Sequence, residues 1–197
     1  MSGEVKQNTS VASGAIATAP SATESSSDPV DNTNPEKVGA QPALATKPSI
    51  DFIKKINEIA EIKTITLAPE IEGMEKFISF LKDQNINIQF GHTLADSKTC
   101  ELYMSSHDVS FTHLYNAMSD NNHRNPGALS AALNNSKFAE IICDLNHVSE
   151  EAILIAKKCI PDLYAITDSI AASGMKDGSY KFANVEIEKK NNKVYLN

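Results

Sequence analysis

Chemically capable side chains follow four successive apolar runs in this sequence. His92 and His113 each come just after one run, Asp144 and His147 follow a third, and Asp168 follows a fourth. Neutral imidazoles bind Zn²⁺ and similar metals, and an aspartate can accept and return a proton. A lone histidine is also compatible with a structural or substrate-contacting role, and Asp168 with capping the next segment. Together, these residues favour a metal-assisted hydrolase.

The elements that must position these side chains alternate between strands and helices. Each run rich in β-branched and aromatic residues is followed by a segment with helical spacing, which predicts an α/β fold. We expect helices to begin near residues 48 and 74 and after Asp96 and Ser149. The five expected strands are residues 64–68, 86–90, 109–112, 138–143 and 163–167. Right-handed βα units bring the carboxyl ends of parallel strands to one rim, where distant residues meet.

Both ends of the chain have a different character. Residues 1–46 are rich in Ser, Ala, Thr and Asn, contain four prolines and lack aromatic residues. Such a segment buries too little apolar surface to offset its ordering entropy, so we expect a disordered low-complexity tail. The domain then covers residues 47–197. Near its end, a strand over residues 180–188 and another over 193–196 predict a hairpin turned at Asn191-Asn192.

Composition narrows the function classes. The net charge is -7, with 25 acidic and 18 basic residues and no basic cluster, which argues against a nucleic-acid partner. The three cysteines lack metal-ligand spacing and indicate reduced thiols. No 18 consecutive residues are apolar, so no membrane association is expected. We therefore expect a cytoplasmic protein.

A polar loop at residues 112–127 follows the third expected strand. It contains Asn116 and Arg124, and an arginine among backbone N–H groups suits a phosphate or other oxyanion. A solvated surface arginine is the alternative interpretation. His107, after two serines, is expected to lie on the surface.

Six fragments in register resemble the N-acetylglucosamine-6-phosphate deacetylases of the amidohydrolase superfamily. They are Ile65-Thr-Leu-Ala-Pro-Glu70, Gly91-His92-Thr93, Thr112-His-Leu-Tyr-Asn-Ala-Met118, His123-Arg-Asn-Pro-Gly127, Asp144 to Val148 and Ile166-Thr-Asp168. The resemblance covers residues 47–197. It implies a partial (β/α)8 TIM-type barrel, usually in a homodimer, that hydrolyses N-acetylglucosamine 6-phosphate to glucosamine 6-phosphate and acetate.

The resemblance also implies roles for individual residues. It makes His92 and His113 ligands of a divalent metal, Zn²⁺ with Fe²⁺ as the alternative, and Asp168 the catalytic acid and base. The residues implied to contact the phosphorylated amino sugar are Asn116, Ala117, Arg124, Asp144 and His147.

The sequence departs from the family at several points. The family's glutamate ligand lies in a Leu-Glu-Gly-Pro-like segment that is absent here, Asn125 replaces a usual Glu and Leu145 a usual Gly. Five expected strands do not close an eight-stranded barrel. Three interpretations therefore stay open: a deacetylase completed by another chain, an inactive remnant, and a non-catalytic phosphosugar-binding module. If the resemblance misleads, an open doubly wound sheet is the alternative fold.

Overall fold

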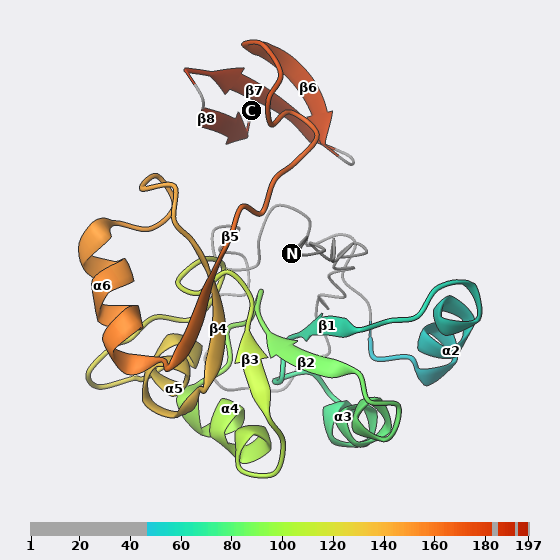
Figure 1. The fold of residues 1–197 in the computed structure, drawn as a ribbon. Coiled ribbons are helices and arrows are strands. Elements are labelled where there is room, and N and C mark those ends of the chain that lie inside the picture. Colours follow the sequence, from blue (N-terminus) through green and yellow to red (C-terminus); the bar gives the residue numbers. More distant parts are fainter. Residues whose placement is uncertain (1–46, 183–184, 192, 197) are drawn as a thin grey trace, which may run out of the picture.

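The computed structural model describes residues 47–182, 185–191 and 193–196. A five-stranded parallel sheet with the order β1-β2-β3-β4-β5 is followed in the chain by a three-stranded sheet, β6-β7-β8 (Figure 1). The strands are β1 (Thr64–Leu67), β2 (Asn87–Phe90), β3 (Val109–Phe111), β4 (Phe138–Ile142), β5 (Asp162–Ile166), β6 (Gly178–Phe182), β7 (Val185–Lys190) and β8 (Lys193–Leu196). The helices are α2 (Ile50–Ile59), α3 (Met74–Asp83), α4 (Ser97–Met104), α5 (Ala128–Asn135) and α6 (Glu150–Cys159). The expected α/β alternation is confirmed, whereas the tail expected at residues 1–46 lies outside the described residues.

Side-chain caps explain where several helices begin. The Oγ atom of Ser49 accepts a hydrogen bond from the Phe52 N–H at 3.2 Å, and Asp96 Oδ1 accepts from the Thr99 N–H at 2.8 Å. The backbone N–H of Thr99 also lowers the pKa of Asp96. Ser149 caps α6, which has acidic residues in its first turn and lysines in its last, as the helix dipole favours. The helix starts expected after Asp96 and Ser149 are confirmed.

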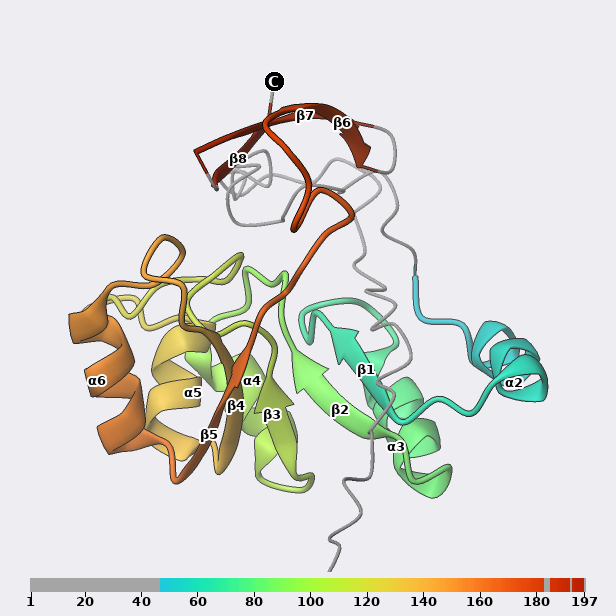
Figure 2. The ribbon, with the colours of Figure 1, turned by 45° about the horizontal axis from the view of Figure 1, so that its top comes forward.

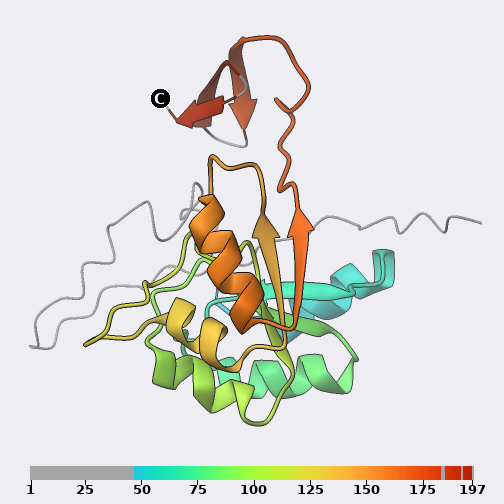
Figure 3. The ribbon, with the colours of Figure 1, turned by 60° about the vertical axis from the view of Figure 1, so that its left-hand side comes forward.

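The apolar core lies between the parallel sheet and helices α3 to α6, which cover one side of it (Figures 2 and 3). Alternate strand residues face these helices because successive side chains of a strand point to opposite faces. Phe90 and Phe111 are fully buried in this layer, and their rings meet edge to face at 5.9 Å. No helix among the described residues is long and apolar enough to cross a membrane.

The other face of the parallel sheet carries a hydrogen-bonded polar network that joins residues of β1, β2, β4 and β5 to Thr112, directly after β3. On one side, Thr112 Oγ1 bonds Thr66 Oγ1 at 2.8 Å and donates to Gln89 Oε1 at 2.9 Å. On the other, Gln89 Nε2 donates to Glu140 Oε1 at 2.9 Å and to the Tyr164 hydroxyl at 3.1 Å. Burial and the Glu140 carboxylate raise the pKa of Tyr164 to about 12, which keeps the phenol neutral. This face is therefore a satisfied polar layer rather than a second apolar core.

The C-terminal hairpin prediction is partly wrong. The structure divides residues 180–188 between two antiparallel strands, with Phe182 paired to Val185, while β7 pairs with β8 as expected. The apolar positions change phase within this span, from Tyr180 and Phe182 to Val185 and Ile187, and this shift is the sequence signal of the break. Of the expected turn, Asn191 has a left-handed φ of 51°, and Asn192 lies outside the described residues.

Candidate active site at the strand carboxyl ends

The carboxyl ends of β2 and β3 bring two histidines into contact. The Nε2 atoms of His92 and His113 lie 2.9 Å apart, and their ring planes cross at 78°. His113 is only 5% exposed, and its Nδ1 atom has no hydrogen-bond partner among the described residues. A hydrogen bond between the rings requires a proton on one Nε2 atom only. The two nitrogens therefore face each other, close enough that both could contact a single cation placed between them.

The charge state of His113 follows from its surroundings. Burial, which disfavours the imidazolium ion, lowers the pKa of His113, and the nearby Asp168 carboxylate opposes this effect. His147 also acts on His113, lowering its pKa. Asp168 and His147 follow the carboxyl ends of β5 and β4, the same edge of the parallel sheet at which the histidine pair lies. His113 is neutral at pH 7, the form in which imidazole binds a metal.

Several residues at this rim have left-handed backbone conformations. The φ angles are 50° at His92, 31° at His113, 48° at Ala117 and 46° at Asp168. Non-glycine residues rarely adopt positive φ, and each such position costs roughly 1–2 kcal/mol. Strain of this kind clusters at functional sites. Sequence patterns gave no sign of it.

Asp144 fixes the ring of His147 beyond β4. Its Oδ1 accepts from the backbone N–H groups of Asn146 and His147 at 2.8 and 2.9 Å, and its Oδ2 contacts His147 Nδ1 at 2.8 Å. Burial of Asp144 favours its neutral form, but these hydrogen bonds outweigh burial and lower the pKa to about 2. Asp144 is thus a carboxylate at neutral pH. Because Nδ1 is engaged, Nε2 is the His147 nitrogen that remains for a ligand.

The loop at residues 112–127 places Asn116 and Ala117 beside the histidine pair but leaves Arg124 farther out. Asn116 Nδ2 donates to the backbone oxygens of His113 and Leu114 at 3.2 and 3.3 Å. Ala117 O accepts from the Thr93 N–H at 3.1 Å. Arg124 is exposed, and its backbone N–H donates to Asn122 Oδ1 at 2.9 Å.

Sequence reasoning gave no role to Glu70, which lies just beyond β1 at this same rim. Its carboxylate accepts hydrogen bonds from Thr93 Oγ1 and from the Leu94 N–H. The available signal was position, because Glu70 is a polar residue that follows a strand as the other candidates do.

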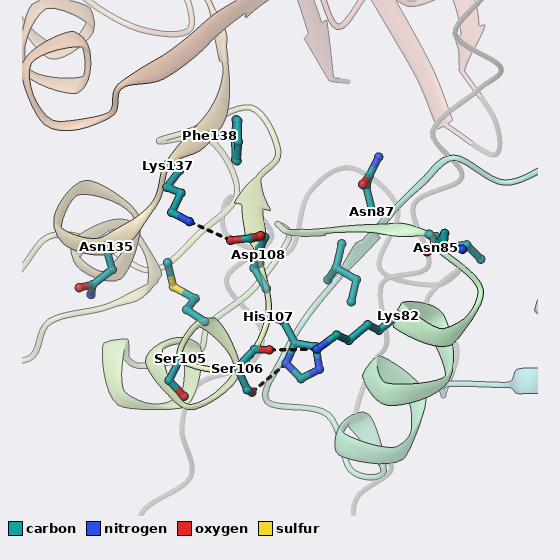
Figure 4. A pocket seen from close by; sticks show the side chains of 14 residues that line it. Lys82, Asn85, Asn87, Ser105, Ser106, His107, Asp108, Asn135, Lys137 and Phe138 are labelled. Carbon is teal, nitrogen blue, oxygen red and sulfur yellow. Dashed lines mark hydrogen bonds and ion pairs between the residues drawn. The ribbon is translucent and has the colours of Figure 1, made fainter.

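A separate cavity of about 630 Å³ lies at the amino-terminal ends of β2, β3 and β4 (Figure 4). Its Lys137 Nζ pairs with Asp108 Oδ1 at 3.2 Å, and Lys82 Nζ donates to Ser106 O at 3.4 Å. His107, expected on the surface, is half-buried and contacts Ser106 Oγ at 2.8 Å. The lysines therefore have partners, and the cavity lies at the opposite strand ends from the histidine pair.

Among the described residues, no group of three or more His, Cys, Asp or Glu side chains could hold a metal ion. The two Nε2 atoms thus offer an incomplete ligand set. A third protein ligand for a metal ion is missing from the described residues.

Known proteins resemble this chain in both sequence and fold. The N-acetylglucosamine-6-phosphate deacetylase of Bacillus subtilis is 39% identical over 160 residues, which cover 78% of this chain and 40% of the relative. The N-acetylgalactosamine-6-phosphate deacetylase of Escherichia coli O157:H7 is 30% identical over 159 residues, covering 78% of this chain and 42% of the relative. No protein-family model matches the sequence.

Solved structures agree with these sequence matches. The N-acetylglucosamine-6-phosphate deacetylase of Pasteurella multocida matches with a TM-score of 0.73 and 27% identity, covering 81% of this chain and 43% of that one. A mutant of the Mycobacterium smegmatis enzyme, solved in complex with N-acetyl-D-glucosamine-6-phosphate, matches with a TM-score of 0.73 and 26% identity. That match covers 79% of this chain and 42% of the other.

The five-stranded sheet with its outer helices and strand-end site is thus part of a parallel α/β barrel of the TIM type. Within that class, the chain is related to the N-acetylglucosamine-6-phosphate deacetylases. It spans about two fifths of the length of the relatives it matches, 40% in the Bacillus subtilis case.

Proposed function

We propose that this chain contributes part of the active site of a deacetylase that hydrolyses N-acetylglucosamine 6-phosphate to glucosamine 6-phosphate and acetate. The observation that carries the proposal is the convergence of two imidazole nitrogens, 2.9 Å apart, at the rim that Asp168 also reaches. The relationship to deacetylases supports the choice of reaction.

The residues fit a divalent metal in part. His92 and His113 would hold it through Nε2, with Zn²⁺ the first choice and Fe²⁺ the alternative, because neutral imidazole suits both. When bound, the metal would polarise the acetamide carbonyl and activate water. The described residues provide no third protein ligand.

The remaining candidates take the roles that the family resemblance implies. Asp168 would take a proton from the attacking water and return it to the leaving amine. Asp144 would hold the His147 ring so that its Nε2 meets a sugar hydroxyl. Asn116, Ala117 and Arg124 would bind the phosphate.

The open edges of the sheet and the free cysteines bear on the partners and the cellular compartment of the protein. In the part of the chain that the structure describes, β1 and β5 are the edges of an open five-stranded sheet. Further barrel strands would pair with these edges, supplied by another chain or by more of the same protein. A homodimer is the assembly that the family resemblance favours. The three cysteines are free in the structure, which supports a reducing compartment such as the cytoplasm.

The direct test is acetate release from N-acetylglucosamine 6-phosphate by the purified chain with added Zn²⁺ or Fe²⁺, with Asp168→Asn as the matched control. The substitution removes the charge and keeps the shape, so activity lost in it identifies Asp168 as the proton carrier. N-acetylgalactosamine 6-phosphate serves as a second substrate. If the folded parent chain releases acetate no faster than Asp168→Asn, the chain is not a self-sufficient deacetylase.

A phosphosugar-binding module is the second candidate, because the described metal ligands are incomplete. Calorimetry with glucosamine 6-phosphate separates it from the enzyme. Binding that needs Arg124 but not Asp168, without acetate release, would support the module. If the chain shows neither binding nor hydrolysis, the remaining interpretation is an inactive remnant.

A further inference from the structure

We propose that Glu70 is a positioning residue that couples the end of β2, which carries His92, to the loop that carries Asn116 and Ala117. The role of these two groups as metal and phosphate contacts rests on the proposed function. The coupling itself rests on hydrogen bonds between loops that follow three different strands.

Glu70 reaches across from the loop after β1 to the loop after β2. Its Oε2 accepts a hydrogen bond from Thr93 Oγ1 at 2.5 Å, and its Oε1 accepts from the Leu94 N–H at 2.8 Å. Charge-assisted hydrogen bonds of this kind are about twice as strong as neutral ones. Both carboxylate oxygens are therefore used to hold the two residues that directly follow His92.

Thr93 passes this constraint to the loop after β3. It is 1% exposed, its N–H donates to Ala117 O at 3.1 Å, and its carbonyl accepts from the Ser119 N–H at 3.0 Å. Its Oγ1 also accepts from the Ala95 N–H at 3.0 Å. Thr93 thus fastens Ala117 on one side and Glu70 on the other.

Ser119 extends the coupling to the start of α5 and the loop that carries Arg124. Its Oγ donates to Ala95 O and accepts from the Ala128 N–H at 2.7 Å. The Ser97 N–H donates to Pro126 O at 2.9 Å, so the loop is also fixed from α4. A shift of Thr93 is therefore transmitted to both candidate phosphate-contacting segments.

Glu72 provides a matched control for Glu70. It lies two residues away in the same loop, is also exposed, and forms an ion pair with Lys47 at 3.8 Å. Glu70→Ala should therefore disturb the rim and Glu72→Ala should not. At the partner position, Thr93→Val removes the hydroxyl with little change in shape, whereas Thr93→Ser keeps it.

The first readout is backbone amide exchange in the ligand-free chain. We expect the Thr93 and Ser119 amides to exchange roughly tenfold faster in both Glu70→Ala and Thr93→Val, because both variants break the hydrogen bond from Thr93 Oγ1 to Glu70. The Leu94 amide should also exchange faster in Glu70→Ala, which removes its acceptor. In Glu72→Ala and Thr93→Ser these rates should stay within about twofold of the parent. Faster exchange at Leu94 alone, with Ser119 unchanged, would overturn the coupling.

The second readout is the affinity for glucosamine 6-phosphate, measured by calorimetry. Residues that orient a binding shell typically change affinity by roughly 10- to 100-fold, so Glu70→Ala and Thr93→Val should weaken binding by about tenfold or more. Thr93→Ser should restore it. Unchanged affinity in a variant with faster Ser119 exchange would overturn the positioning role. If the parent chain fails to bind the sugar phosphate, the proposed function fails, and the exchange data still decide the coupling.

Discussion

The Nε2 atoms of His92 and His113 lie 2.9 Å apart although the residues are 21 positions apart in the sequence. Each histidine follows a strand of the same sheet, and β2 and β3 are parallel neighbours. The pair therefore depends on strand register, because a slip of one residue would turn either side chain to the other face.

The histidine pair predicts metal binding that needs both rings. His92→Ala and His113→Ala should each weaken Zn²⁺ binding at least about tenfold, or about 1.4 kcal/mol, because either change leaves one imidazole ligand. Competition with a chromogenic chelator measures this affinity. His107→Ala is the matched control, since its ring contacts Ser106 in the cavity at the opposite strand ends. Equal loss in the control would contradict the assignment.

Acid should remove a stabilising contribution from Asp144. Its pKa is lowered from 3.8 to about 2 in the folded chain, so its contribution is fully present above pH 3.8 and is lost as pH falls towards 2. Because 40% of its side chain is exposed, solvent screening limits the effect to about 0.5–1 kcal/mol. Urea unfolding should therefore show Asp144→Asn to be less stable than the parent at pH 5. The difference should shrink at pH 2.5, and a difference independent of pH would contradict this account.

The strand and helix positions were predictable because local patterns encode them. Apolar runs located the five parallel strands, and the polar residues Asp96 and Ser149 marked helix starts, since a cap acts within three residues of itself. The rim positions of His92 and His113 followed from the alternation of strands and helices, which brings the carboxyl ends of parallel strands to one rim. By contrast, the bond from Glu70 to Thr93 joins residues 23 positions apart, and no local pattern encodes it. The break between β6 and β7 did have a local signal, because the apolar positions shift by one residue between Phe182 and Val185, and the interpretation of residues 180–188 as one strand overlooked it.

A side chain added at Gly127 should displace the loop that carries Arg124. An added Cβ atom would lie 2.5 Å from Ser119 Oγ and 2.7 Å from the Ser119 carbonyl carbon, so Gly127→Ala must push the loop away from Ser119. We expect a loss of about 1–3 kcal/mol in the free energy of unfolding. Urea denaturation measures it, with Asn125→Ala in the same exposed loop as a control that should stay within about 0.5 kcal/mol. Equal stability of the two variants would show that the loop adjusts freely.

Two neighbouring lysines on β7, Lys189 and Lys190, should differ in how much their substitution lowers stability. Lys189 is 6% exposed and its Nζ donates to Ala172 O and Met175 O at 3.1 and 2.7 Å, whereas Lys190 is exposed. Lys189→Met leaves these carbonyls without their donor, so it should cost about 1–3 kcal/mol and loosen the segment after Asp168.

Native-state trypsin digestion reports that loosening through the rate of cleavage after Lys176, which lies in this segment. The rate should rise in Lys189→Met and stay at the parent value in Lys190→Met. Similar rates in the two variants would mean that Lys189 does not fasten the segment.

At His92, His113 and Asp168 the left-handed backbone conformation lowers folding stability, whereas the side chain supplies the chemistry of the candidate site. Glycine adopts such conformations without strain, so at these three positions the substitution that removes the reactive group also relieves backbone strain. A screen that rewards heat resistance alone would therefore tend to erase the site, whereas a screen that rewards ligand binding would keep its strain. Thermostabilisation of this protein is best directed at residues remote from the rim.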